Sequence, residues 1–461
     1  MSMRFESPRV RGRGGRRSGH LESLERREVP SALPLVADPA ITNTAYVEAV
    51  YQDVLGRQAD PTGLQWGTSL VDSGQPRASF AVPLIFSDEA NSQFIRSAYQ
   101  QYLGRETDLT GLTYWLAQMQ AGTKNQAIEA AFLSSDEFYA RAGGTTDGWI
   151  QAAYQTVLGR AAEAEALSWA TSELNAGKSR YDLAMALVMS MEGETRSVEG
   201  ELTRLGMSLN AAIASALAAE LSAGQVTEQQ VTADFLTTPE YFEAHTGVPD
   251  TIVPVPNWLP TAPKTEADIS AQAAGGNANV VFIGDSITQL WQSTGSSDWN
   301  QYFAPLRSLD AGVAGDSTEN LLWRLEQGNL NGISPKLAVV MVGVNDVGKG
   351  DSAGDVVTGI TSVVRTVQNE FPNAKILLLG VLPALQVPAN SAVRQEIDQI
   401  NQAIAPLADG QRIWFLDVSA QLLNPDGSLN QSLFQAGNIH PNAQGYHLLA
   451  QAIAPSVQAL S

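Results

Sequence analysis

One serine and one histidine in the second half of the chain have the surroundings that acyl transfer requires. Ser286 follows the apolar run Val280–Ile283 in the sequence Gly-Asp-Ser. Such a run predicts a buried strand, and a hydroxyl at the turn that ends it would lie at the carboxyl edge of a sheet. His440 stands in Ile-His-Pro-Asn, just before the last predicted helix. A serine nucleophile with a histidine base is the chemistry that these residues suggest.

Two further motifs lie between Ser286 and His440 and contain hydrogen-bond donors for a developing oxyanion. Gly315 belongs to the glycine-rich turn 311–318, which leads into a predicted helix, Glu319–Gln327. Asn345 follows the apolar run Leu337–Val342 in Gly-Val-Asn-Asp. Each motif alone is typical of an ordinary turn or helix cap. Together they supply a glycine N–H and an asparagine amide, which acyl transfer uses as donors.

These four blocks resemble the SGNH (GDSL-type) hydrolase family, in the order of that family and over about residues 275–460. The segment Gly315–Leu325 resembles its platelet-activating-factor acetylhydrolase-like branch. The resemblance implies that Ser286 attacks an ester carbonyl and that His440 accepts its proton. It also implies an oxyanion hole made of the Ser286 and Gly315 backbone N–H groups and the Asn345 side chain.

The third member of a catalytic triad is open. The family places an aspartate three residues before the histidine, and this chain has Gly437 there. Asn438 is one residue away and uncharged, while Asp426 and Asp417 are acidic but cannot be placed by spacing. A Ser–His dyad whose imidazole is oriented by a backbone carbonyl is the other arrangement.

The elements that would position these residues follow an alternating pattern. Further apolar runs alternate with the helical patterns Asp355–Glu370 and Val393–Ala405. Alternation of this kind predicts a parallel sheet covered on both faces, hence a three-layer α/β/α sandwich over residues 266–461, as the resemblance also implies. The predicted strands are Val280–Ile283, Leu337–Val342, Ile376–Val381 and Ile413–Leu416.

The first half of the chain is repetitive. The segment Tyr51–Arg57 recurs as Tyr99–Arg105 and Tyr154–Arg160, each with a Leu-Gly-Arg ending. The copies predict an all-α region of three to four units over residues 42–245, each with two or three short helices. A tryptophan follows each copy: Trp66, Trp115 and Trp169. A second repeated segment closes each unit, and a fourth copy keeps this segment alone. These segments are Phe86–Glu89, Phe132–Phe138, Val188–Glu192 and, as the fourth, Phe235–Tyr241.

We expect the repeated arginine to cap carbonyls or to pair with the Asp or Glu that recurs in its unit, and the tryptophans to be core. The copies resemble a family of short helical repeats of unknown function, related to phycobilisome linker domains. That resemblance implies scaffolding or interaction, and suggests a surface component as the partner of the repeats.

The two remaining segments connect or precede these regions. Residues 246–265 contain five prolines, which favour an extended linker. Residues 1–41 begin with an Arg/Gly-rich stretch that is read as a targeting or disordered segment, with an RNA-binding tail as the alternative. Leu21–Ser31 resembles a short motif of bacterial surface and extracellular proteins. It favours a secreted or cell-surface protein; otherwise the expected location is cytoplasmic.

Composition excludes several classes of protein. The formal charge is −20, although eight of the 28 basic residues lie within residues 1–28, so nucleic acid is not an expected partner of the acidic body. The chain has no cysteine, no apolar run long enough to span a membrane, and no second histidine at ligand spacing. Asn424–Gly427 is read as a turn and not as a calcium loop. We therefore expect no metal and no cofactor.

Two functions from different classes follow. The first is a serine esterase that hydrolyses small acyl esters of carbohydrate or lipid, with acetyl as the expected acyl group. The second is a non-catalytic surface or interaction protein with a degenerate hydrolase domain, which Gly437 in place of an acid suggests.

Overall fold

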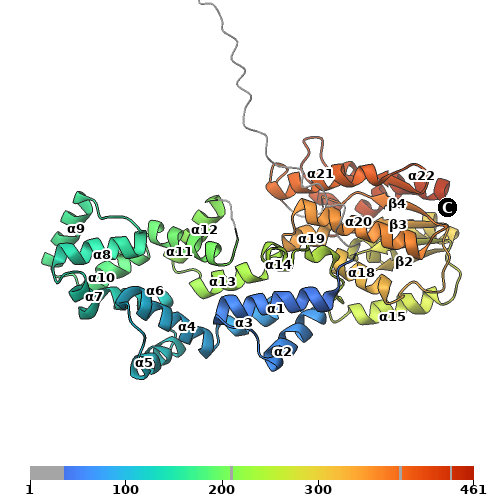
Figure 1. The fold of residues 1–461 in the computed structure, drawn as a ribbon. Coiled ribbons are helices and arrows are strands. Elements are labelled where there is room, and N and C mark those ends of the chain that lie inside the picture. The colour runs from blue at the N-terminus through green and yellow to red at the C-terminus, as the bar shows by residue number, and fades with distance from the viewer. Residues whose placement is uncertain (1–35, 208–210, 384–386, 437–438) are drawn as a thin grey trace, which may run out of the picture. The chain divides into compact units, whose positions relative to one another are not determined.

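The computed structural model describes residues 36–207, 211–383, 387–436 and 439–461. A helical region leads into a sheet region, drawn from blue to green and from yellow to red (Figure 1). Among the described helices, none is long and apolar enough to cross a bilayer. The helices of the first region are α1 (Pro39–Leu55), α2 (Pro61–Asp72), α3 (Ala78–Ile85), α4 (Asp88–Ala98), α5 (Leu109–Gln120), α6 (Asn125–Ser134), α7 (Asp136–Arg141), α8 (Thr146–Leu158), α9 (Ala164–Asn175), α10 (Arg180–Val188), α11 (Met191–Arg204), α12 (Ala211–Ser222), α13 (Glu228–Thr237) and α14 (Pro239–Thr246).

The repeated Leu-Gly-Arg ends a helix in each unit and then fixes the unit's last helix. Gly56 adopts a left-handed conformation, φ 68°, which stops α1 where the sequence predicts. The arginine after it forms a two-pronged ion pair with a glutamate 32 residues on, so the predicted pairing is confirmed in all three units. The pairs are Arg57–Glu89, Arg105–Glu137 and Arg160–Glu192, with Nε–Oε1 distances of 2.5, 2.7 and 2.5 Å.

The tryptophans of the repeats are less buried than predicted. Trp66 and Trp169 are 40 % and 49 % exposed. Trp66 packs one edge on Phe80 and Trp115 packs on Phe132, each with ring centres 5.4 Å apart. A short helix on the surface of a small unit can cover an indole on one face only, so these side chains border the core.

The helical region contains two cores. One gathers α4 to α10, including Ile95, Phe132 and Trp149. The other joins the first unit to the last helices, where Tyr46 of α1 donates a hydrogen bond to the Leu236 carbonyl of α13. The chain therefore returns to its beginning before it enters the sheet region.

The sheet has five parallel strands in the order β2-β1-β3-β4-β5 within the described residues. This order places β1 beside both β2 and β3, so three carboxyl ends meet at its centre, with Gly284 opposite Gly312 and Met341. The strands are β1 (Val280–Gly284), β2 (Ser308–Gly312), β3 (Leu337–Met341), β4 (Lys375–Leu379) and β5 (Ile413–Leu416).

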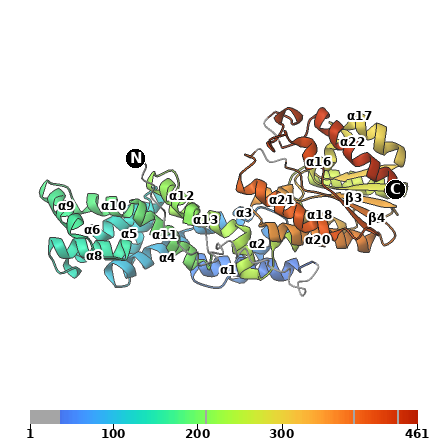
Figure 2. The same ribbon diagram turned by 90° about the horizontal axis from the view of Figure 1, so that it is seen from above.

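Helices cover both faces of this sheet, which confirms the predicted three-layer sandwich. Figure 2 shows α18, α20 and α21 on one side and α16, α17 and α22 on the other. The α-helices of the sheet region are α15 (Ala262–Ala273), α16 (Ser286–Gln289), α17 (Ser296–Asp298), α18 (Thr318–Glu326), α19 (Val344–Lys349), α20 (Ala353–Glu370), α21 (Ala392–Ile404) and α22 (Ala443–Leu460). Strand β2 is the element that sequence analysis misses, because Ser-Leu-Asp-Ala-Gly lacks a continuous apolar run.

The proline-rich segment after α14 is packed between the two regions. Thr251, Ile252 and Val253 are buried, the last two in the core of the first helical unit. On the other side the Thr251 hydroxyl donates to the Asp355 carbonyl at 2.8 Å. The Thr318 hydroxyl of α18 donates to the Thr251 carbonyl at 3.0 Å. Residues 250–252 form one 3-10 turn with extended residues on either side, and the buried residues of the stretch attach it to both regions.

Candidate active site

Ser286 is presented by a turn in which two glycines permit close backbone contacts. Strand β1 ends at Gly284, and Asp285 caps α16 by accepting the Ile287 N–H at 2.8 Å. A side chain at Gly284 would lie 2.2 Å from the Met341 carbonyl oxygen of β3. One at Gly312 would lie 2.1 Å from the Gln289 backbone nitrogen. The turn therefore holds Ser286 at the carboxyl edge, close to the neighbouring strands.

His440 lies beside Ser286, although 154 residues separate them. Its Nε2 atom is 2.8 Å from Ser286 Oγ. The loop that carries His440 is fixed by Asn442, which caps α22 and donates to the Ser432 and Phe434 carbonyls. The structure thus brings together the two residues that the sequence singles out.

Tyr446 sets the position of α22 relative to α16. This tyrosine is fully buried, and its hydroxyl donates to the Ile287 carbonyl at 2.7 Å. Its ring meets the Trp291 ring edge to face, with centres 4.7 Å apart. Because α16 begins at Ser286, this contact fixes the helix after the histidine to the helix of the serine.

No carboxylate among the described residues forms a hydrogen bond or ion pair with His440. Partial burial lowers the pKa of the ring, whereas a neighbouring carboxylate would raise it. Asp426 is exposed and accepts hydrogen bonds from the Ser428 N–H and hydroxyl, at 2.9 and 2.6 Å. Asn438 and Gly437 lie outside the described residues.

His447 is also better connected than its place on a surface helix suggests. Its Nδ1 atom is 2.8 Å from Asp298 Oδ1, and its Nε2 atom contacts Gln451. This pair joins α22 to α17 and has a structural role.

Gly315 and Asn345 follow β2 and β3, the strands on either side of β1. Gly315 has φ +80° in the loop after β2, and Asn345 lies in the first turn of α19 after β3. Both are half-buried. The Asn345 Nδ2 atom donates to the Asp316 carbonyl at 2.7 Å, which joins the two loops. An amide nitrogen has two hydrogens, so this contact uses one of them.

Asn257, from the proline-rich segment, supports the Gly315 loop. Its Nδ2 atom lies 2.9 Å from the Ala314 carbonyl and 2.9 Å from Asp316 Oδ1, so it spans the glycine on both sides. Asn257 is 6 % exposed. Sequence analysis misses this residue because it lies outside the predicted sheet domain, and a lone asparagine near prolines is typical of a turn.

A buried ion pair connects this loop to the sheet. Arg324 of α18 and Asp316 are 1 % and 0 % exposed, with Nε and Oδ2 at 2.6 Å. The same guanidinium donates to the Gly284 carbonyl at 3.1 Å and to the Ala311 carbonyl at 2.8 Å. Burial raises the pKa of Asp316, and Arg324 opposes this rise. A single arginine in an otherwise apolar stretch, Leu-Leu-Trp-Arg-Leu, is the sequence signal for this role.

Two more aspartates beneath the site shape turns. Burial raises the pKa of Asp285 and of Asp310 to about 7, partly offset by backbone N–H groups. Asp285 caps α16, and Asp310 Oδ1 accepts the Gly312 N–H at 3.0 Å. Within the described part of the chain, no cluster of three His, Cys, Asp or Glu side chains has the arrangement of a metal site.

Comparison with known proteins identifies the sheet region. A model described as the GDSL-like lipase/acylhydrolase family matches residues 282–448. The platelet-activating factor acetylhydrolase IB subunit alpha1 of Pongo abelii is 36 % identical over 182 residues, which are 39 % of this chain and 73 % of that protein. This chain belongs to the GDSL-like lipase/acylhydrolase family.

The human protein of the same name is 40 % identical over 152 residues, which are 33 % of this chain. The match spans 63 % of that relative's length, less than two thirds. Among solved structures, a GDSL-like lipase from Bacteroides thetaiotaomicron is 22 % identical, with 43 % of this chain and 97 % of that chain covered and a TM-score of 0.36. An acetylxylan esterase from Geobacillus stearothermophilus is 19 % identical, with 40 % and 96 % covered and a TM-score of 0.32.

The helical region matches a domain of unknown function (DUF4214) three times, at residues 37–92, 86–142 and 129–196. These matches agree with the three Leu-Gly-Arg units. They begin before the first predicted unit boundary at residue 42 and end before 245, which leaves α12 to α14 outside them.

Removal of Arg324 tests the buried pair. We expect Arg324→Met to lower the free energy of unfolding by about 3–5 kcal/mol, because Asp316 would stay buried without its cation and two carbonyls would lose donors. Urea unfolding of the full chain, followed by circular dichroism, measures this loss. The double variant Arg324→Met/Asp316→Leu is the control, since it removes both charges and should lose less than the single variant. Equal losses would contradict a dominant role of the unpaired charge.

Proposed function

We propose that the chain is a serine esterase that hydrolyses small acyl esters, such as acetyl esters, of a carbohydrate or a lipid. The observation that carries the proposal is the 2.8 Å contact between Ser286 Oγ and His440 Nε2 at the sheet edge where Gly315 and Asn345 also lie. A nucleophile, a base and hydrogen-bond donors at one place are the minimum set for ester hydrolysis.

The reaction that we infer proceeds in two steps. His440 Nε2 takes the Ser286 hydroxyl proton as Oγ bonds to the ester carbonyl carbon. The resulting tetrahedral intermediate collapses, the C–O bond to the alcohol breaks, and the imidazolium returns its proton to the leaving alcohol. Water, deprotonated by His440, then attacks the acyl-serine, and the acid leaves as Ser286 regains its proton.

Donors to the developing oxyanion lower the barrier of both steps. We assign them to the backbone N–H groups of Ser286 and Gly315 and to the side chain of Asn345. Each such donor is worth about 3 kcal/mol of barrier in a comparable hydrolase. The left-handed turn at Gly315 and the Asn345–Asp316 contact support this assignment, because they hold the two loops before substrate arrives.

The base in this proposal works without a carboxylate from the described residues. Partial burial lowers the pKa of the imidazole and so favours the neutral form that accepts a proton, but no described carboxylate stabilises the imidazolium that forms. Loss of the comparable acid costs a serine protease about 10⁴ in kcat. The arrangement therefore supports a Ser–His dyad and a slower enzyme than a full triad would give.

A fluorophosphonate probe tests the nucleophile and the base. We expect covalent labelling of the full chain at Ser286, lost in Ser286→Ala and slowed by about 10³-fold or more in His440→Ala, because the alkoxide is generated by the imidazole. Intact-mass spectrometry after timed exposure measures it. His447→Ala is the matched control and should label like the native chain. No labelling of the native chain would favour the alternative, a surface or interaction protein with a degenerate hydrolase domain.

The pH dependence of hydrolysis tests the electrostatics of His440. A histidine base must be neutral, so kcat/KM should rise with pH and reach its plateau by neutrality, with a midpoint below about 6.5 because burial lowers the ring's pKa. The Gly437→Asp variant restores an acid at the family's position and should raise both kcat and this midpoint. Ala436→Asp adds the same charge one residue away and is the control. A native midpoint above 6.5 would indicate an acid partner already present.

Asn257 tests whether the proline-rich segment supports the oxyanion loop. We expect Asn257→Ala to lower kcat by about tenfold with little change in KM, because two hydrogen bonds around Gly315 are lost and an oxyanion donor becomes less ordered. Steady-state kinetics on p-nitrophenyl acetate measures both constants. Asn401→Ala, which also removes a buried amide bonded to backbone groups, is the control for a general loss of stability. The same fall in both variants would refute the specific role.

A further inference from the structure

A cavity of about 520 Å³ extends from the two proposed oxyanion residues toward the helical region. We call it the junction cavity, and its lining includes Gly315 and Asn345 from the sheet region. The proline-rich segment contributes Trp258 and Leu259, and the turn between α2 and α3 contributes Gln75. Its walls therefore come from all three parts of the chain, and the catalytic fold alone would leave it open on one side.

The wall contributed by the helical region is tightly packed. Gly74, in the α2–α3 turn with φ +72°, lies so close to the proline-rich segment that a side chain there would come within 1.7 Å of the Pro256 carbonyl oxygen. The Ala37 N–H also donates to the Ile252 carbonyl at 2.8 Å. Contacts of this closeness tolerate only glycine, so the turn that carries Gln75 has a fixed place beside the cavity.

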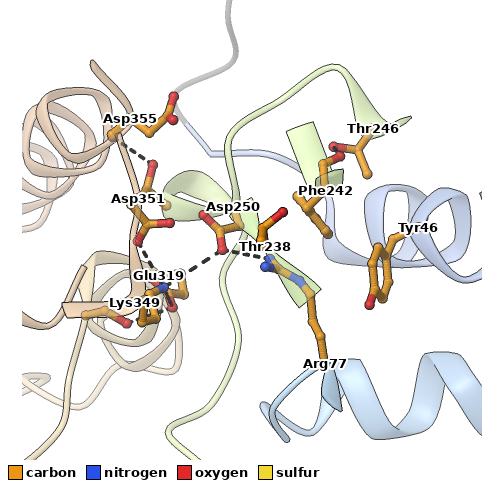
Figure 3. A network of polar contacts seen from close by, with 12 residues as sticks. Tyr46, Arg77, Thr238, Phe242, Thr246, Asp250, Glu319, Lys349, Asp351 and Asp355 are labelled. Atoms are coloured by element: carbon orange, nitrogen blue, oxygen red, sulfur yellow. Dashed lines mark hydrogen bonds and ion pairs between the residues drawn. The ribbon is translucent and has the colours of Figure 1, made fainter. Parts of the chain in front are cut away.

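The floor of the cavity is a chain of alternating charges, shown in Figure 3. Arg77 lies 4.2 Å from the Phe242 ring centre and pairs with Asp250, Nη2 to Oδ2, at 2.7 Å. Lys349 Nζ lies 3.9 Å from the same Asp250 oxygen and 2.6 Å from Glu319 Oε1. One network thus joins side chains from the turn before α3, from the proline-rich segment, and from α18 and α19.

The charged side chains that line this floor are balanced. They are two cations, Arg77 and Lys349, and two carboxylates, Asp250 and Glu319. Burial would raise the pKa of Asp250, but Lys349 and Arg77 outweigh it and the pKa is lowered, so this group is ionised. Asp351 lies behind Lys349, with its Oδ2 atom 3.3 Å from Nζ, and burial and the neighbouring Asp250 raise its pKa well above the usual range. A ligand therefore needs no net charge to match the lining of this floor.

An indole stands beside these polar groups. Trp258 lines the cavity and is 51 % exposed, an unusual exposure for a side chain of its area. A flat apolar ring next to amide and charged side chains matches a ligand with an apolar face and a hydroxylated edge. A pyranose ring has this combination, whereas an alkyl chain would cover Lys349 and Glu319 without replacing their contacts with water.

We propose that the junction cavity binds the sugar of a neutral O-acylated saccharide, with Trp258 as its stacking platform and Gln75 as a hydrogen-bonding contact from the helical region. The proposal rests on the esterase function and selects carbohydrate from the two substrate classes named there. It also gives the first helical unit a role in substrate binding.

Kinetics of the full chain on two esters test the proposal. The substrates are acetylated xylo-oligosaccharides and p-nitrophenyl acetate, which has no sugar. We expect Trp258→Ala to raise KM for the saccharide ester by about tenfold and to change kcat/KM for p-nitrophenyl acetate by less than about twofold. Gln75→Ala should act in the same direction with a smaller effect. Trp66→Ala removes another partly exposed indole, in the middle of α2 and outside the cavity lining, and should change neither.

Each other outcome overturns a distinct claim. If the native chain hydrolyses neither ester, the esterase proposal fails. If it hydrolyses p-nitrophenyl acetate and Trp258→Ala lowers activity on both esters equally, the indole supports the loop and not a sugar. If Trp258→Ala weakens hydrolysis of tributyrin but not of the saccharide ester, the cavity binds lipid. Calorimetric titration of the Ser286→Ala variant with unacetylated xylo-oligosaccharides measures sugar binding directly. If the double variant Ser286→Ala/Trp258→Ala binds them with the same affinity as Ser286→Ala, Trp258 is not a stacking platform.

Discussion

The buried pair between Arg324 and Asp316 is the contact on which the site's geometry depends. A guanidinium with almost no exposure costs several kcal/mol to desolvate, and that cost is met only where its donors find acceptors. Here they do: a carboxylate of the Gly315 loop, the carbonyls at the ends of β1 and β2, and the Asn329 side chain. One side chain therefore fixes the end of the serine's strand and the loop of the glycine to the same helix.

This arrangement explains why the motifs are rich in glycine. Arg324 donates to carbonyls at the ends of β1 and β2, which are already paired in the sheet, and α16 follows β1 directly and passes close to β2. Gly284 and Gly312 are the positions at which a side chain would collide with backbone atoms of β3 and α16. Mobility is not the reason for these glycines. They are needed because the strands and the first helix approach more closely than a Cβ atom allows.

Sequence reasoning predicts the fold well, for a physical reason. Apolar periodicity reports burial directly, so four of the five strands and the flanking helices are predictable, and Ser286 and His440 stand in distinctive turns. Strand β2 is missed because an edge strand of five residues with Asp310 in it has little apolar signal. Asn257 and Tyr446 are missed because their roles arise from tertiary contacts between segments about 60 and 160 residues apart.

The packing of residues 250–259 changes what the helical repeats mean for the hydrolase fold. A spacer of the same composition would leave the Gly315 loop exposed on its outer side. In this chain Asn257 and Leu259 cover that loop, and Asp250 and Ile252 attach the covering segment to the first helical unit. The loop's order therefore depends on residues that belong to neither predicted domain. A fold cut away at residue 266 would lose one wall of its cavity and the contacts that Asn257 makes with the Gly315 loop, so the first helical unit and the sheet region are packed as one structural unit.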